Sequence, residues 1–277
     1  MDIAVALAGF PYVLKMPKIV KVNLKGHLQP GSAAKDIILE MLRRCTVKGG
    51  VGKIYEYVGE GAKTLSIPER VTITNMGAEL GATTSVFPAD EQVHRFLKAQ
   101  GREQDYTPWE PDEGCSYDEE MEIDLDTLEP LVACPHMPDN VMKVADVQGA
   151  GTAGVHRQLH QRFLQRLQES GAGTQGPQNL PTVSLVLGIS SRQIYLRLMQ
   201  DGVLAELLNA GCRLTELACG PCCGIGIAPP AKALQSGPPT GTSRPEQHGG
   251  CQPVPGKPEV AAATAIKGEL ALPQDVM

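Results

Sequence analysis

The chain has 277 residues, of which 42% are hydrophobic and 20% charged, a composition typical of a globular protein with a buried core. Its net charge of -6 excludes a basic surface of the kind that neutralises phosphates, so nucleic acid is not expected as a partner. No apolar run approaches the roughly 20 residues of a membrane helix, and the chain starts without a cationic secretory leader. We therefore expect a cytoplasmic protein with no membrane partner.

The first part of the chain has the pattern of an α/β protein. KIVKVNLKG at 18–26 and RVTITNMG at 70–77 each predict a strand, because both are rich in β-branched residues. Between them we expect a helix that Ser32 can cap and that ends at Thr46. Four apolar residues fall on one face of this helix at helical spacing: Ile37, Ile38, Met41 and Leu42.

A polar stretch over 101–118 interrupts this pattern and predicts a domain linker. After it, PTVSLVLG at 181–188 predicts a buried strand, and residues 191–211 predict one or two helices that end at Gly211. This order predicts an α/β fold with a mostly parallel sheet and helices on its faces. Segments 149–180 and 231–257 have low-complexity composition, for which surface insertions are the simplest interpretation.

The motif CGPCCGIG contains the strongest candidate for metal chemistry. Cys219 and Cys222 form a Cys-x-x-Cys pair, and the flanking glycines let the backbone pass close to an ion or cluster. A structural zinc site needs four ligands, and the sequence has no second Cys-x-x-Cys pair. A [4Fe-4S] cluster in a dehydratase needs only three cysteines. A redox pair and buried, unreactive cysteines are the alternatives.

A second candidate site lies in TITNMGAELGATTSVFP. If a strand ends near Thr74, then Asn75 and Glu79 lie at its carboxyl end, where α/β sheets generally bind ligands. Asn can anchor a substrate carboxylate, and Glu can exchange a proton with a metal-bound water. The alternative interpretation makes Asn75 a turn residue and Glu79 an acid in the first turn of a helix.

Several blocks of the sequence together resemble the aconitase family. They include PKIVKVNLKGHLQPGSAAKDIILEMLRR at 17–44, KGGVGKIYEYVGEGAKTLSIPERVTITNMGAELGATTSVFPAD at 48–90, LVACPHMPDNV at 131–141, and ACGPCCGIG at 218–226. The resemblance implies aconitase-like three-layer α/β/α domains. It also implies that Cys219 and Cys222 are two of the three ligands of a [4Fe-4S] cluster, and that Asn75 and Glu79 belong to the catalytic wall.

The resemblance further implies the reaction and the domain boundaries. The expected activity is aconitate hydratase, which isomerises the tricarboxylates citrate and isocitrate through cis-aconitate. The large subunits of 3-isopropylmalate dehydratase or homoaconitase, which act on isopropylmalate or homocitrate, are the alternative within the family. Residues 1–26 correspond to the end of a first domain, 27–100 to a second, 101–118 to a linker and 119–277 to a third. The first domain and the last, swivelling domain are then expected on another part of the same polypeptide (in cis) or on a separate chain (in trans).

One expected block is missing from the sequence. The family's third cluster cysteine lies in a Ser-Cys-Thr-Asn block, and segment 149–180 occupies its place. Moving one possible coding sequence of residues 156–169 by one base gives IGSCTNASYNDFK, which contains that block. We therefore hypothesise that segments 149–180 and 231–257 are out-of-frame translations, and that the chain as written is inactive. A non-catalytic remnant or an RNA-binding derivative is the alternative from another functional class.

Overall fold

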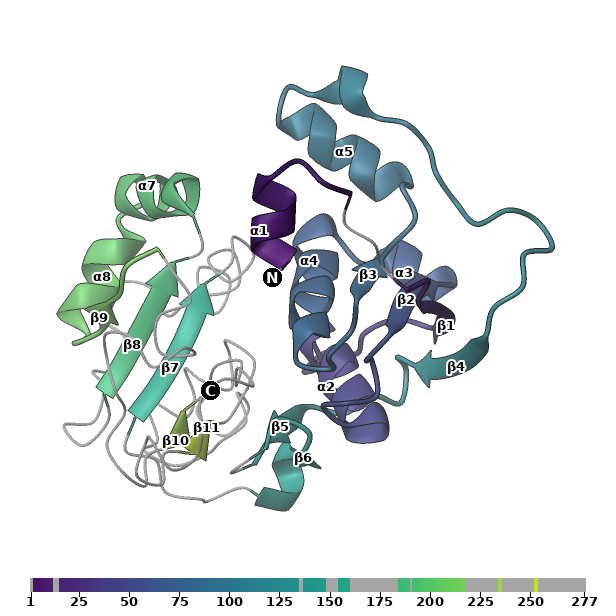
Figure 1. Cartoon of the computed structure of the whole chain (residues 1–277). Helices are drawn as coiled ribbons and strands as arrows, with labels where there is room; N and C mark the ends of the chain where they lie inside the picture. Colours follow the sequence, from purple (N-terminus) through teal and green to yellow (C-terminus); the bar gives the residue numbers. More distant parts are fainter. Residues whose placement is uncertain are drawn as a thin grey trace.

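The computed structural model describes residues 2–11, 15–134, 137–147, 154–159, 184–189, 191–217, 234–235 and 252–253. Figure 1 shows two groups of elements: strands β1 to β4 with helices α2 to α5, and strands β7 to β9 with helices α7 and α8. A short helix, α1 (Asp2–Leu7), precedes the first group. None of the helices in these ranges combines the length and the apolar character that a membrane span requires.

A four-stranded parallel sheet forms the centre of the first group. It consists of β1 (Lys18–Lys25), β2 (Lys53–Val58), β3 (Thr84–Val86) and β4 (Glu119–Asp124), in the order β3-β2-β1-β4. All three strand pairs are parallel. Val20, Val22 and Leu24 alternate along β1 and are fully buried, as expected for a central strand. The strand predicted at 18–26 and the mostly parallel α/β fold are confirmed.

The segment 101–118 connects two strands of this one sheet. β4 follows the segment directly and pairs with β1 from Val20 to Lys25. Within the segment, Glu103–Asp105 forms a 3-10 helix, and Trp109 makes an isolated bridge to Ala89. The predicted domain boundaries at 26, 100 and 118 stay predictions, although the sheet contains strands from both sides of each boundary.

Helix α2 (Ala34–Cys45) follows β1 and packs on the sheet. The four apolar residues of its predicted face are each fully buried, and the helix ends before Thr46, which has a φ of 61°. The predicted cap at Ser32 is wrong. The Ala33 N–H instead donates to Asp36 Oδ2 over 2.7 Å, and the Ser32 hydroxyl donates to the Leu128 carbonyl. Ser32 lies one residue too early to cap this helix, so its hydroxyl is used elsewhere.

Asp36 ties the start of α2 to strand β5 (Leu131–Ala133), because its Oδ1 accepts a hydrogen bond of 2.9 Å from the Leu131 N–H. Its side chain is 1% exposed. Asp36→Ala should therefore lower the free energy of unfolding by roughly 2–3 kcal/mol, since the N–H groups of Ala33 and Leu131 lose their acceptor. Urea unfolding measures this loss. The exposed Asp105→Ala is the control and should change little; equal losses in both variants would contradict the assignment.

The predicted strand at 70–77 is wrong, because most of it belongs to helix α4 (Ile67–Asn75). The Ser66 N–H donates to Glu69 Oε2 over 2.8 Å, and Pro68 lies in the first turn, so the helix start is well specified. Ile73 and Arg70 are buried, and α4 packs against α2. Capping and burial thus outweigh the local β preference of the Val-Thr-Ile-Thr run.

Shorter elements complete the first group. Helix α3 (Glu60–Thr64) follows β2, and helix α5 (Glu91–Ala99) follows β3. After β4, strands β5 and β6 (Val141–Lys143) form an antiparallel pair, followed by a 3-10 helix at Val144–Val147.

The second group is a three-stranded parallel sheet with two helices. The sheet consists of β7 (Gly154–Leu159), β8 (Ser184–Ile189) and β9 (Arg213–Leu214), in the order β7-β8-β9. Helices α7 (Arg192–Gln200) and α8 (Val203–Asn209) follow β8. The predicted buried strand and the helical region before Gly211 are confirmed.

The two low-complexity segments contain short strands. β7 lies in the first segment. The second segment contains β10 (Leu234–Gln235) and β11 (Gln252–Pro253), which pair in parallel.

Candidate functional site

The structure describes two of the four predicted site residues. Cys219 and Cys222 lie outside the described residues, so their expected role as cluster ligands stays a prediction. Asn75 and Glu79 lie in a well-described part of the first group. The site is therefore built here from the segment that contains these two residues.

This segment connects the end of α4 to the start of β3. Residues Met76–Ala78 form a 3-10 helix, η1, that continues directly from α4. The Thr83 N–H then donates to the carbonyl of Lys53, the first residue of β2, over 2.9 Å. The Gly50 N–H donates to the Leu80 carbonyl, also over 2.9 Å. The segment therefore lies at the amino end of β2 and β3, and the predicted position at a strand's carboxyl end is wrong. The position was mispredicted because helix α4 replaces the expected strand. The chain returns along α4 to the amino end of the sheet before β3 begins.

Asn75 and Glu79 lie in different environments. Asn75 is the last residue of α4, with helical dihedral angles (φ -61°, ψ -43°), and its side chain is exposed. Glu79 directly follows η1 and is 9% exposed. Neither residue fits the alternative interpretation, since Asn75 is helical and Glu79 ends a helix instead of starting one.

Glu79 has a carboxyl group in an electrostatically unusual environment. Burial raises its pKa from 4.5 to about 7, because a charged carboxylate loses its hydration in this layer. A hydrogen bond from the backbone of Glu79 and, to a smaller extent, the positive charge of Lys35 act in the opposite direction and lower the pKa. Oε2 of Glu79 is buried and has no hydrogen-bond partner within the described part of the chain. A buried carboxyl that titrates near neutral pH is suited to proton exchange.

Lys35 is a buried charged residue that the sequence interpretation missed and whose charge affects the pKa of Glu79. It lies in the first turn of α2 and is 8% exposed. A signal was present in the sequence, because Lys35 precedes Ile38 and Leu42 at the helical spacing of the apolar face. A lysine on the buried face of a helix indicates a nearby negative charge.

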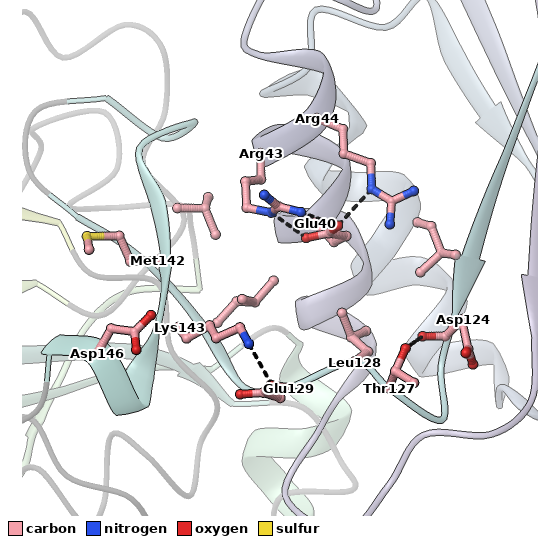
Figure 2. A pocket seen from close by; sticks show the side chains of 13 residues that line it. Glu40, Arg43, Arg44, Asp124, Thr127, Leu128, Glu129, Met142, Lys143 and Asp146 are labelled. Carbon is pink, nitrogen blue, oxygen red and sulfur yellow. Dashed lines mark hydrogen bonds and ion pairs between the residues drawn. The ribbon is translucent and has the colours of Figure 1, made fainter.

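A separate pocket of about 480 Å³ lies between α2, β4 and the β5–β6 pair, and Figure 2 shows the residues that line it. Arg43 and Arg44 both contact the buried carboxylate of Glu40, and Lys143 contacts Glu129, each over 2.7 Å. Burial raises the pKa of Glu40, but the hydrogen bonds from the two arginines outweigh this effect and hold the pKa below its ordinary value. The three positive groups thus each contact a carboxylate of the pocket, and the pocket contains none of the predicted site residues.

The described residues contain no set of three or more His, Cys, Asp or Glu side chains that could hold a metal ion. The free cysteines in these ranges are Cys45, Cys115, Cys134 and Cys212. Burial raises the pKa of the Cys134 thiol, which disfavours the thiolate form that binds metal. The predicted cluster ligands Cys219 and Cys222 lie outside these ranges.

Comparison with known proteins identifies the family. The model of the aconitase family (aconitate hydratase) matches residues 1–172. This chain belongs to the aconitase family. The 3-isopropylmalate dehydratase large subunit 1 of Thermotoga maritima is 35% identical over 81% of the chain and 54% of its own length. The 3-isopropylmalate dehydratase large subunit 2 of Archaeoglobus fulgidus is 31% identical over the whole chain and 67% of its own length. The mitochondrial aconitate hydratase of Candida albicans is 35% identical over 80% of the chain and 31% of its own length.

The aconitase-family match includes Lys35, Asn75 and Glu79, whereas Cys219 and Cys222 lie beyond the matched residues. The chain spans about half the length of the Thermotoga relative. Proteins of this family generally use a [4Fe-4S] cluster, but the described residues alone provide no site for one.

Proposed function

We propose that this chain is part of a hydro-lyase of the 3-isopropylmalate dehydratase large-subunit kind, in which Glu79 exchanges a proton during the addition and removal of water. The observation that carries the proposal is the environment of Glu79. Its carboxyl is buried, has one oxygen without a partner among the described residues, and has a pKa of about 7. Hydration of a carbon–carbon double bond needs a group that accepts and donates a proton near neutral pH.

The relatives favour 3-isopropylmalate over citrate as the substrate. The sequence alone predicted aconitate hydratase, with the isopropylmalate enzymes as the alternative. The Thermotoga and Archaeoglobus relatives, which are 3-isopropylmalate dehydratase large subunits, support this choice, and the Candida aconitate hydratase supports the second candidate. Both substrates are hydroxy acids with several carboxylates, so Asn75, exposed at the end of α4, is proposed to hydrogen-bond one of these groups. Aconitate hydratase activity is the second candidate.

The proposed cofactor is a [4Fe-4S] cluster held by Cys219, Cys222 and a third cysteine restored by the frame correction. When bound, it would supply a Lewis-acidic iron for the departing hydroxyl group. The first domain and the swivelling last domain are proposed as partners, in cis or in trans.

Anaerobic reconstitution with iron and sulfide tests this proposal. Two proteins are compared: the chain as written, and a chain in which residues 156–168 are replaced by IGSCTNASYNDFK. We expect absorbance near ~400 nm, typical of an iron–sulfur cluster, from the restored chain. Cys219→Ser in the restored chain should abolish it, and Cys115→Ser, which changes an exposed cysteine, should not.

Turnover is then measured with the restored chain and separately produced first and last domains. We expect conversion of 3-isopropylmalate, and a loss of at least about 100-fold in Glu79→Gln, typical of removing a general acid–base group. Conversion of citrate alone would replace the proposal by its second candidate. Absence of a cluster from the restored chain would contradict the enzyme proposal and favour a non-catalytic remnant.

A further inference from the structure

The loop between α2 and β2 contacts the turn of residues 77–82, which contains Glu79. Gly50, in this loop, is buried, and its N–H donates to the Leu80 carbonyl over 2.9 Å. An ideal Cβ on Gly50 would lie 2.8 Å from the Ala82 nitrogen and 2.9 Å from the Leu80 carbonyl oxygen, well inside the optimal separation of about 3.5–4.0 Å. Gly50 is not one of the glycines with positive φ, so this contact, and not the backbone conformation, requires a glycine.

Two backbone hydrogen bonds close this turn around Glu79. The Gly81 N–H donates to the Ala78 carbonyl over 3.0 Å. The Ala82 N–H donates to the Gly77 carbonyl over 3.1 Å. Because both bonds span Glu79, its backbone moves together with the part of the turn that the loop contacts.

The position of the turn determines how well the Glu79 carboxyl is shielded from water. Glu79 is 9% exposed, and its Oε2 is buried without a hydrogen-bond partner in the part of the chain that the structure describes. Protein interiors are closely packed, so a small displacement of the backbone changes the surroundings of a buried side chain. A close contact between two backbones resists such a displacement, because neither side can relieve it by turning a side chain.

We propose that Gly50 is a positioning residue for Glu79: its close backbone contact with Leu80 and Ala82 fixes the turn that holds the Glu79 carboxyl in its buried place. A side chain at position 50 would push the turn away from the loop and admit water to the carboxyl. A positioned carboxyl is what proton exchange at a defined point of a substrate requires. This consequence for turnover rests on the proposed function, whereas the effect of Gly50 on the hydration of Glu79 does not.

Carbon-13 NMR of the full chain with labelled glutamate carboxyls tests the inference. The Glu79 signal is assigned by its absence from Glu79→Gln, and its titration midpoint in the parent is expected at about pH 7. Gly50→Ala adds one methyl group at the contact and changes no charge. The carboxyl should then become better hydrated, so the titration midpoint should fall by about half a pH unit or more.

Gly61→Ala is the matched control. Gly61 is a buried glycine of α3, and an ideal Cβ there would lie 2.9 Å from the Leu24 carbonyl oxygen. Because α3 follows the carboxyl end of β2, this contact is remote from the turn at the amino end of the sheet. Both variants should unfold at lower urea concentration than the parent, but Gly61→Ala should leave the titration midpoint of Glu79 unchanged.

The titration separates positioning of Glu79 from a general loss of stability. An unchanged midpoint in folded Gly50→Ala would overturn the inference, and so would equal falls in Gly50→Ala and Gly61→Ala. If Gly50→Ala does not fold, Gly77→Ala takes its place, since an ideal Cβ on Gly77 would lie 2.8 Å from Ser85 Oγ and press on the same turn. Its midpoint should also fall, and Ser85→Ala, added to Gly77→Ala, should restore it; either result failing would overturn the inference. Failure to assemble a cluster or to convert substrate would contradict the proposed function but would not alter these midpoints, so the two failures are distinguishable.

Discussion

A Glu79→Gln variant is expected to become more stable than the parent protein as the pH rises. The folded-state pKa of Glu79, about 7, lies above its ordinary value of 4.5. The stability that this group contributes is therefore fully present below pH 4.5 and is lost as the pH rises through 7. The difference between the two pKa values corresponds to roughly 3 kcal/mol. Glutamine has a similar shape and no charge, so the variant does not lose this stability.

Urea unfolding of the parent and the variant across this pH range measures the effect. The informative quantity is the change with pH in the stability difference between the two proteins, because differences in packing cancel. Glu113→Gln changes an exposed acid and should follow the parent at every pH. If the free energies of unfolding of Glu79→Gln and of the parent changed with pH in parallel, Glu79 would not be buried in its acidic form. The proposed catalytic group would thus reduce the stability of the protein at neutral pH, a cost often found at active sites.

Arg70→Met is expected to cause the largest loss of stability, about 3–5 kcal/mol. Arg70 is 4% exposed, and its guanidinium makes four hydrogen bonds of 2.6–3.1 Å, to the carbonyls of Ala62, Leu65 and Pro88 and to the carboxylate of Asp90. Removing it leaves these acceptors, including one charge, without their donor in a buried region.

The same unfolding experiment provides the controls for Arg70. Arg70→Lys should recover little of the loss, since an ammonium group cannot match the planar fork of a guanidinium. Arg95→Met removes an exposed arginine that pairs with Glu91 on one helix, and such pairs contribute little. A loss in Arg70→Met no larger than in Arg95→Met would contradict the role given to this network.

Helix α2 and strand β1 could be predicted because their patterns agree with their burial. Val20, Val22 and Leu24 alternate on a strand, and Ile37, Ile38, Met41 and Leu42 recur at helical spacing. Helix α4 could not be predicted from its β-branched run, because its start at Ser66 and Glu69 and its packing on α2 decide its conformation. Single-residue propensities amount to a few tenths of a kcal/mol and are easily outweighed by such contacts.

The candidate site was predictable in part. The resemblance to the aconitase family drew attention to Glu79, and the structure gives this residue a buried and electrostatically unusual environment. Its position at the amino end of the sheet was missed, because that position depends on α4 being a helix. The electrostatic effect of Lys35 on Glu79 was missed because the two residues are distant in sequence. The roles of Cys219 and Cys222 remain predictions, since both lie outside the described residues.

The pairing of β4 with β1 determines how the protein can be shortened. The six residues Glu119–Asp124 form hydrogen bonds with β1 across a sequence separation of about a hundred residues. A fragment beginning at Glu119 would leave its first strand without a neighbour, and the remaining fragment would expose β1 as a new sheet edge, where unpaired backbone groups promote aggregation. Any shortened form intended for expression should therefore keep both strands in one polypeptide or supply them as two co-expressed pieces.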